Sequence, residues 1–372
     1  MAGNTRRVRK WGRKRDQVPR CHVTDATPSG DTPLKDALSG TIRTLKKCGS
    51  ASSPCRPIHD VARLEGVLSP LLPVQLTQLA GGRLGSELLA LDLGALQVMR
   101  LRFDRPLHGG GPKPTGRQLI ALDLEENPGQ PVMRSHGLEL PVTAFFGLAA
   151  GGEIHLTTPE RCSLALLSLD RERFLQWARE LGGPGLEEPL EGVNWQAIDP
   201  RRFETVKACL RRIFRLAERS PALMEDPAIR RQLGGDLVPL LVEALVHRTG
   251  HGARLARPPA RIELVKAAQA WMAEHPHEPI SLDGLCRQVA AGRRSLLQGF
   301  QEHLGMGPMA YLKIRRLHGV RQALLSADPE TERVAELAAR WGFLNAGHFA
   351  RDYRALFGEP PGTSLRVTGA NR

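Results

Sequence analysis

The sequence of 372 residues lacks any apolar run of the roughly 18–20 residues that a membrane-spanning helix needs. Its longest weakly polar stretch, Val142 to Gly152, is too short and contains three glycines. The N-terminal segment MAGNTRRVRKWGRKRDQ is charged, and no apolar segment follows it, so it lacks the pattern of a secretory signal. We therefore expect no membrane span and a cytoplasmic location.

Cysteines and aromatic residues are also scarce. Aromatic residues make up 5% of the chain, so the cores must be packed mainly with Leu, Ala and Val. No C-x-x-C pair occurs among the six scattered cysteines, Cys21, Cys48, Cys55, Cys162, Cys209 and Cys286. This sparse use is typical of a reducing compartment, and the spacing argues against a zinc site held by cysteines.

Common catalytic motifs are missing as well. No Gly-x-Ser-x-Gly elbow of a serine hydrolase occurs. A metal-dependent cupin enzyme is an alternative, with His108, His136, His155, Glu139 and Glu153 as its candidate ligands. However, that region has no His-x-His pair, and its histidines are isolated in the sequence. We expect no catalytic residues, no metal and no cofactor.

The chain has a large excess of positive charge, which is unevenly distributed. The net charge is +13 and the isoelectric point is about 10.1, values typical of proteins that bind nucleic acid. Residues 1–57 carry about +9 of it, residues 58–258 are neutral, and residues 259–372 carry about +4. We interpret residues 1–57 as a basic, disordered tail; a non-specific phosphate-binding arm is the alternative.

Residues 80–170 contain short apolar runs separated by glycine and proline, which predict strands. The runs are 86–93, 96–103, 118–124 and 162–169, and the glycine-rich segment 109–117 is predicted to be a hairpin loop. Helical periodicity follows over residues 170–249. The pattern indicates a domain at residues 58–250 that consists of a β-barrel or sandwich with packed helices, which could also bind a second copy of the chain.

Residues 251–260, HGARLARPPA, form a Gly/Pro/Arg-rich linker, and residues 261–366 form the next domain. Here helix, tight turn and helix occur twice: Leu285, Phe300, Gly305 and Pro308 of the first copy recur 52–53 residues later. A long helix from Pro308 to Leu325 joins the copies. This repeat predicts two helix-turn-helix units, the arrangement that places a recognition helix in the major groove.

The motifs of this region resemble the DNA-binding domain of AraC/XylS-type transcription regulators of bacteria. The matching segments are Ile280-Ser-Leu, Arg294-Ser-Leu, Phe300 with Leu304-Gly305, Tyr311-Leu312, Arg315-Arg-Leu317, Trp341-Gly-Phe343, His348-Phe349, Arg351-Asp-Tyr353, and Phe357-Gly358 with Pro360-Pro361. Residues 78–125 loosely resemble the sensor part of ethanolamine-utilisation regulators. This sequence departs from the family pattern at Gly292 and Gly362, where serine is frequent.

The resemblance implies an α+β protein: a cupin-like N-terminal β-barrel or sandwich sensor domain with packed helices, then an all-α double helix-turn-helix domain. It implies a sequence-specific activator that binds promoter DNA and RNA polymerase, responds to a small-molecule effector and forms a homodimer. The family's base-contacting positions correspond to Arg293, Arg294, Leu297 and Gln298 in the first unit. In the second unit they correspond to Asn345, Ala346, Gly347, His348, Arg351 and Arg354.

The residue types suit this role. Arginine can bind guanine, glutamine can bind adenine, and an exposed leucine can contact a thymine methyl group. Arg351 is the strongest candidate for reading a base, although a phosphate contact or a surface ion pair remains the alternative for each arginine. A repressor, or an architectural protein that binds DNA only through its charge, is the alternative function within DNA binding.

Overall fold

The computed structural model describes residues 56–125, 132–149, 151–182, 190, 194–246 and 260–369. Most of the predicted basic tail and of the linker 251–260 lies outside these residues. The exceptions are Arg56 and Pro57, which belong to a strand, and Ala260, which begins a helix. We call residues 56–246 the N-terminal domain and residues 260–369 the C-terminal domain.

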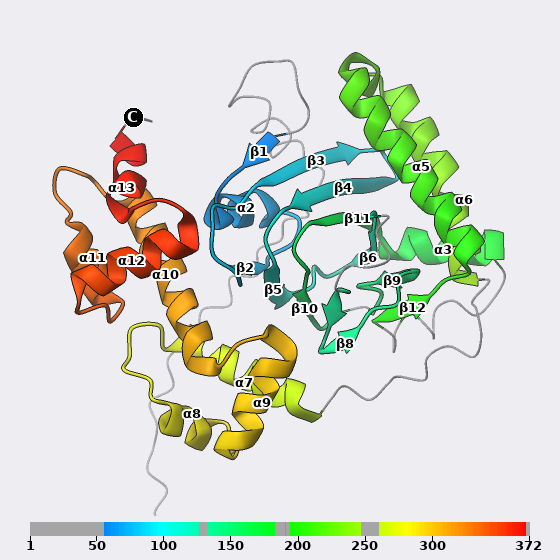
Figure 1. Cartoon of the computed structure of the whole chain (residues 1–372). Coiled ribbons are helices and arrows are strands. Elements are labelled where there is room, and N and C mark those ends of the chain that lie inside the picture. Colours follow the sequence, from blue (N-terminus) through cyan, green and yellow to red (C-terminus); the bar gives the residue numbers. More distant parts are fainter. Residues whose placement is uncertain are drawn as a thin grey trace, which may run out of the picture.

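Two antiparallel sheets form the N-terminal domain (Figure 1). The seven-stranded sheet has the order β1 (Arg56–Ile58), β3 (Ser86–Asp92), β4 (Leu96–Phe103), β11 (Cys162–Asp170), β6 (Arg117–Asp123), β9 (Ala144–Phe146) and β12 (Trp195–Ala197). The five-stranded sheet has the order β2 (Gln75–Gln78), β5 (Leu107–Pro112), β10 (Glu153–Thr157), β7 (Arg134–Ser135) and β8 (Leu138–Glu139). The predicted β domain is therefore confirmed, and its strands extend beyond residues 80–170 on both sides.

The glycine-rich segment was predicted wrongly. Gly109 to Pro112 are not a hairpin loop but belong to β5, which pairs with β2 on one side and β10 on the other. Glycine is needed at Gly111, because a Cβ there would lie 2.4 Å from the carbonyl oxygen of Pro73. The close approach of the backbone at Pro73, rather than a turn, explains the glycine Gly111.

The seven-stranded sheet has an apolar core on each face. On one face it packs against α3 (Arg171–Gly182), α5 (Pro200–Arg219) and α6 (Pro227–Val246), with η1 (Pro221–Glu225) between the last two. On the other face the core is shared with the second sheet and with α2 (Val61–Leu68). The apolar residues of α5 and α6 are buried against the sheet of their own chain, so these residues are not exposed for contact with a second copy.

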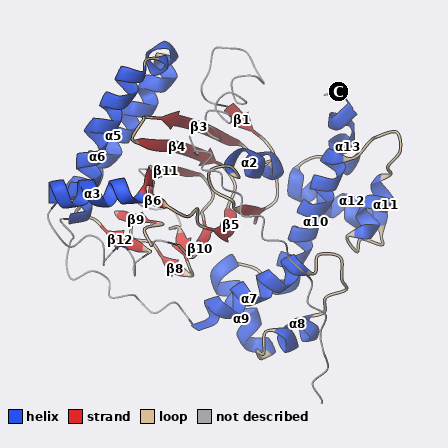
Figure 2. Cartoon of the chain, turned by 180° about the vertical axis from the view of Figure 1, so that it is seen from behind, coloured by secondary structure: helices blue, strands red, loops and turns tan. Residues whose placement is uncertain are grey.

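The C-terminal domain is entirely helical and contains two separate cores (Figure 2). The first core joins α7 (Ala260–Glu274), α8 (Leu282–Gln288) and α9 (Arg293–Leu304) to the beginning of α10 (Pro308–Ser326). The second joins the rest of α10 to α11 (Val334–Arg340), α12 (Ala346–Phe357) and α13 (Pro361–Gly369). The predicted pair of helix-turn-helix units on a linking helix is confirmed.

Candidate DNA-binding surface

The first unit exposes the predicted side chains of its second helix. Ser281 caps α8 by accepting a hydrogen bond from the backbone N–H of Gly284 at 3.0 Å. Leu296 and Phe300 are fully buried and fix α9 against the core. The four predicted base-contacting residues are all exposed: Arg293, Arg294, Leu297 and Gln298. Gly292 precedes α9 without a side-chain cap, as its departure from the family pattern predicts.

The second unit has the same geometry with a better-capped helix. The side-chain oxygen of Asn345 accepts a hydrogen bond from the backbone N–H of His348 at 2.9 Å. Phe349 and Tyr353 are buried. The six predicted base-contacting residues are exposed: Asn345, Ala346, Gly347, His348, Arg351 and Arg354. Asn345 thus has a structural role at the helix terminus that the sequence did not reveal.

Arg351 is the residue for which the sequence predicts a base contact most strongly. Its side chain is 71% exposed, and its Nε lies 4.0 Å from a carboxylate oxygen of Asp352. An exposed ion pair at this distance contributes little to stability and is easily exchanged for another acceptor. The guanidinium of Arg351 can therefore turn towards a base edge without disturbing the core.

The linking helix α10 fixes the second unit through a close contact. Gly319 packs against the ring of Trp341, and a Cβ at this position would lie 2.2 Å from two of the ring atoms. At the other end of α10, the ring of Tyr311 packs 5.8 Å from that of Phe300 of the first unit. Both units are thus attached to one helix, which limits how far they can turn relative to each other.

The N-terminal domain contacts the last turn of both recognition helices. At α9, Arg134 Nη1 donates to the carbonyl oxygen of Glu302 at 2.6 Å. At α12, the N–H of Gly82 donates to the carbonyl oxygen of Ala355 at 3.0 Å, and Gln78 Nε2 donates to that of Leu356 at 3.1 Å. These carbonyls have no partner within their own helices, so the other domain satisfies them.

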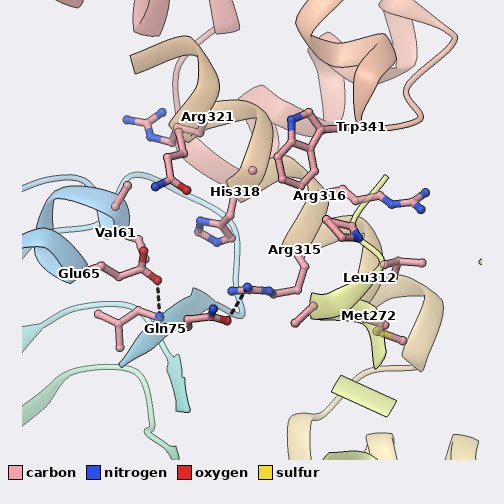
Figure 3. A pocket seen from close by; sticks show the side chains of 16 residues that line it. Val61, Glu65, Gln75, Met272, Leu312, Arg315, Arg316, His318, Arg321 and Trp341 are labelled. Atoms are coloured by element: carbon pink, nitrogen blue, oxygen red, sulfur yellow. Dashed lines mark hydrogen bonds between the residues drawn. The ribbon is translucent and has the colours of Figure 1, made fainter. Parts of the chain in front are cut away.

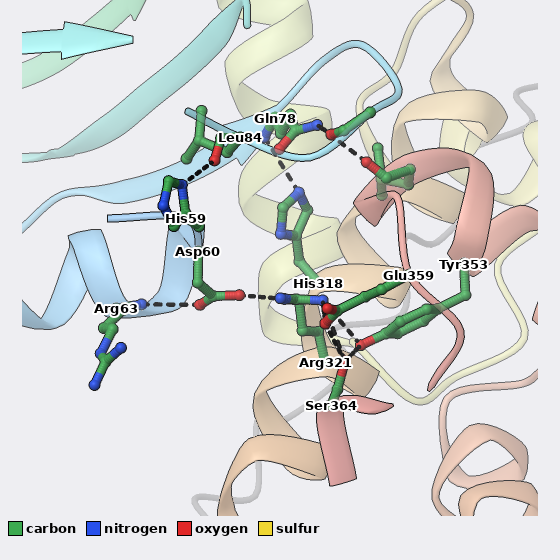
Figure 4. A network of polar contacts seen from close by, with 12 residues as sticks. His59, Asp60, Arg63, Gln78, Leu84, His318, Arg321, Tyr353, Glu359 and Ser364 are labelled. Carbon is green, nitrogen blue, oxygen red and sulfur yellow. Dashed lines mark hydrogen bonds and ion pairs between the residues drawn. The ribbon is translucent and has the colours of Figure 1, made fainter. Parts of the chain in front are cut away.

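A buried polar network reinforces the contact at the second unit (Figure 4). The guanidinium of Arg321 on α10 pairs with Asp60 of the N-terminal domain and, at 2.9 Å, with Glu359. It also donates to Tyr353 Oη at 3.3 Å and Ser364 Oγ at 3.2 Å. Burial opposes the charge of Arg321, but the two carboxylates hold its pKa above the ordinary value.

Next to this network, His318 of α10 joins the domains as a neutral ring. Its Nε2 accepts a hydrogen bond from the backbone N–H of Gln78 at 3.2 Å. Burial lowers its pKa to about 3, and the positive charge of Arg315 acts in the same direction. The ring packs edge-on against Phe357, with the ring centroids 5.2 Å apart.

The histidines of the β domain are not isolated in space, in contrast to the sequence-based expectation. The ring centroids of His108 and His155 are 4.4 Å apart, and those of His136 and His155 are 6.1 Å apart. Gln269 of α7 bridges the first pair, with its Oε1 3.0 Å from His155 Nε2 and its Nε2 3.1 Å from His108 Nε2. Nε2 of His155 donates to the amide oxygen, whereas Nε2 of His108 accepts from the amide nitrogen, which requires a neutral His108 ring. Burial lowers the pKa of both histidines.

These histidines nevertheless do not form a recognisable metal site. Among the described residues, no group of three or more His, Cys, Asp or Glu side chains is arranged to hold a metal ion. The same part of the chain contains no helix that is long and apolar enough to cross a membrane.

A cavity of about 290 Å³ lies between the two domains (Figure 3). Glu65 and Gln75 line it from the N-terminal domain, and Leu312, Arg315 and Trp341 line it from the C-terminal domain. Arg315 reaches across and donates to Gln75 Oε1 at 2.9 Å and, outside the lining, to Thr77 Oγ1 at 3.1 Å. A molecule in this cavity would touch both domains. No sequence motif indicates this cavity, because the parts of its lining that come from the two domains are more than 190 residues apart in the sequence.

Sequence reasoning also missed Leu344, in the turn before α12. It is 90% exposed, the highest value among the exposed large hydrophobic residues of the described chain. The only signal in the sequence is an apolar residue directly before a capping asparagine.

Comparison with known proteins shows what the C-terminal domain is similar to. A family model described as a helix-turn-helix domain matches residues 285–366. The probable thc operon regulatory protein of Rhodococcus erythropolis is 39% identical over 147 residues, which are 39% of this chain and 44% of that protein. The chain therefore spans less than half of that relative.

Two further matches extend the comparison. The XylDLEGF operon transcriptional activator of Pseudomonas putida is 25% identical over 292 residues, which cover 77% of this chain and 86% of that protein. A solved structure of a probable AraC family transcriptional regulator from Rhodopseudomonas palustris is 33% identical. The match covers 28% of this chain and 97% of that one, with a TM-score of 0.27.

Proposed function

The chain belongs to the AraC/XylS family of transcription regulators, and on this basis we propose that it activates transcription by reading two adjacent major-groove segments of a promoter. The observation that carries the proposal is that all ten predicted base-contacting residues are exposed, on α9, on α12 or at the N-cap of α12, and that one linking helix joins α9 and α12. Two recognition helices held in this way can enter successive major grooves on one face of the DNA.

The two helices have different reading chemistry. The first offers Arg294, Gln298 and Leu297, which suit guanine, adenine and the thymine methyl group. Gln298 Nε2 now donates to Glu302 at 2.9 Å, an exposed contact that a base can replace. In the second, Arg351 supplies the main base contact, and Gly347 allows the helix to approach the bases closely. The remaining arginines bind phosphates and position the chain.

The experiment is selection of operator DNA from a random pool by the full chain, followed by binding measurements with Arg351→Ala. We expect this variant to lose about 1–3 kcal/mol on the selected operator and to become less specific at one base pair. Arg201→Ala, which removes an exposed arginine of α5 far from the reading helices, is the control with the same change of charge. Equal loss on random DNA would support a phosphate contact instead, and a pool without a preferred sequence would support the architectural alternative.

We also propose that a small-molecule effector controls this binding through the contacts between the domains. The cavity between them is the proposed effector site, since ligand sites occur preferentially at domain interfaces. An effector that changes how the domains meet would change the relative orientation of α9 and α12, because the N-terminal domain contacts the last turn of each.

Breaking these contacts tests the coupling. In the absence of effector, the contacts restrain the two units, so we expect Gln78→Ala and Arg134→Ala each to raise the affinity for the operator. Arg201→Ala, the exposed arginine of α5 used above, is the control and should leave the affinity unchanged. Unchanged or weaker binding by both variants would contradict the proposed restraint.

RNA polymerase and a second copy of the chain are the further partners that we propose. In a purified transcription assay, the activator is expected to raise transcription from a promoter that carries the selected operator. Reduced transcription would indicate a repressor. Sedimentation of the protein with its operator tests the homodimer, whose contact must use surfaces other than the buried apolar faces of α5 and α6.

A further inference from the structure

Leu344 lies at the position where a leucine normally has a structural task. With Asn345 as the N-cap, Leu344 is the residue before the cap, and Phe349 is the fourth residue of α12. An apolar residue before the cap often packs on the fourth residue of the helix as a hydrophobic staple. Here Phe349 is 2% exposed and packs on Phe343, with ring centroids 5.2 Å apart, whereas Leu344 is 90% exposed. Leu344 therefore contributes little to the core.

The small residues at the start of α12 leave room for Leu344 to approach DNA. The next residues after the capping Asn345 are Ala346 and Gly347, whose side chains are too small to extend beyond the backbone. A Cβ added at Gly347 would have only the side-chain oxygen of Asn345 near it, at 3.5 Å. Leu344 is thus the large apolar side chain at the N-terminal end of the second reading helix, the end that contacts base edges in helix-turn-helix proteins.

We propose that Leu344 reads the 5-methyl group of a thymine in the major groove of the second half-site. This inference rests on the proposed function, since it requires α12 to enter the groove. Thymine is the base that presents an apolar group there, and contact with it removes both the methyl group and the leucine from water. The first unit has no large side chain at the matching position, Ala291, which precedes the N-cap Gly292, so the two half-sites are read with different side chains.

The test uses the operator selected by the full chain and replaces each thymine of the second half-site, one at a time, with uracil, which lacks only the methyl group. We expect one replacement to weaken binding of the unchanged protein about 3- to 10-fold, the effect of losing one buried methyl contact. Leu344→Ala should bind the thymine operator more weakly by a similar factor and should not distinguish thymine from uracil. Leu344→Met, which keeps an apolar side chain, should preserve the preference.

The control is Leu223→Ala, which shortens a leucine of η1 that is 42% exposed and lies outside the C-terminal domain. Its operator binding should equal that of the unchanged protein. The proposal is overturned if Leu344→Ala binds as tightly as the unchanged protein, or if the uracil effect persists in that variant. Those results leave the proposed function intact, whereas failure to select any operator refutes the proposed function itself.

Discussion

Replacing Gly319 with alanine tests how the linking helix positions the second reading unit. The added Cβ would lie 2.2 Å from two atoms of the Trp341 ring, where ordinary contacts are 3.4–4 Å. Helices α10 and α11 must therefore move apart by more than 1 Å at this point, or the indole must leave its place. Forcing extra volume into a packed contact typically costs about 1–3 kcal/mol, which exceeds the gain of up to about 1 kcal/mol from replacing glycine inside a helix.

The assay is differential scanning calorimetry of the full chain combined with operator binding. We expect Gly319→Ala to unfold the C-terminal domain at a lower temperature and to weaken operator binding, because α12 shifts relative to α9. Gly235→Ala in α6 is the matched control: nothing lies within 4 Å of its added Cβ, so it should be neutral or slightly stabilising. If Gly319→Ala is as stable as this control and binds the operator normally, the contact does not set the geometry of the second unit.

Four further predictions concern pH, capping, the tail and metal. The pKa values of His136 and His318 are about 4 and about 3 in the folded protein, against 6.5 without burial. Between the folded and the unfolded pKa of each histidine, the unfolded chain therefore binds more protons than the folded chain. The free energy of unfolding consequently falls as the pH decreases below 6.5. At pH 5.5 each of the two histidines lowers the free energy of unfolding by about 1.4 kcal/mol relative to pH 7.5, which urea unfolding can measure. The variant His318→Gln should show a weaker dependence of this free energy on pH. A free energy of unfolding that does not change with pH would refute the lowered pKa values. Asn345→Ala should destabilise the second unit by about 0.5–2 kcal/mol in the same experiment, since it removes the cap of α12; no loss would mean that the cap is unimportant. Deleting residues 1–55, which precede β1, should keep operator specificity and at most flatten the salt dependence of affinity; lost specificity would give the tail a reading role. Elemental analysis should find no stoichiometric zinc or iron, and either metal would revive the cupin alternative for the clustered histidines.

Local sequence patterns predicted the C-terminal domain well, because each pattern has a local physical cause. The glycines that end α9 and α12, Gly305 and Gly358, have φ angles of +71° and +73°, as helix caps require. The apolar spacing also identified Leu296 and Phe300 as core, and hence the opposite face of α9 as exposed. The ten candidate DNA-contacting residues come from the family pattern, and the apolar spacing agrees with it for Arg294, Leu297 and Gln298.

The prediction was less complete where distant segments meet. The glycines Gly109 to Gly111 suggested a loop, because the sequence does not show that the backbone of Pro73 passes close to Gly111. The same limit applies to Gln269, which bridges His108 and His155, and to the pairing of Asp60 with Arg321, 261 residues apart in the chain. Such contacts depend on how two finished surfaces fit together, and no periodicity within either segment reports that fit.

The central claim, that one chain reads DNA with two recognition helices, is tested most directly by footprinting the full chain on its selected operator with a guanine-methylation probe of the major groove. Two recognition helices on one chain should protect two major-groove segments on one face of the DNA, with centres about 10–10.5 base pairs apart. In Arg351→Ala, protection should weaken in one segment only. A single protected segment, or even protection along the whole fragment, would contradict the account.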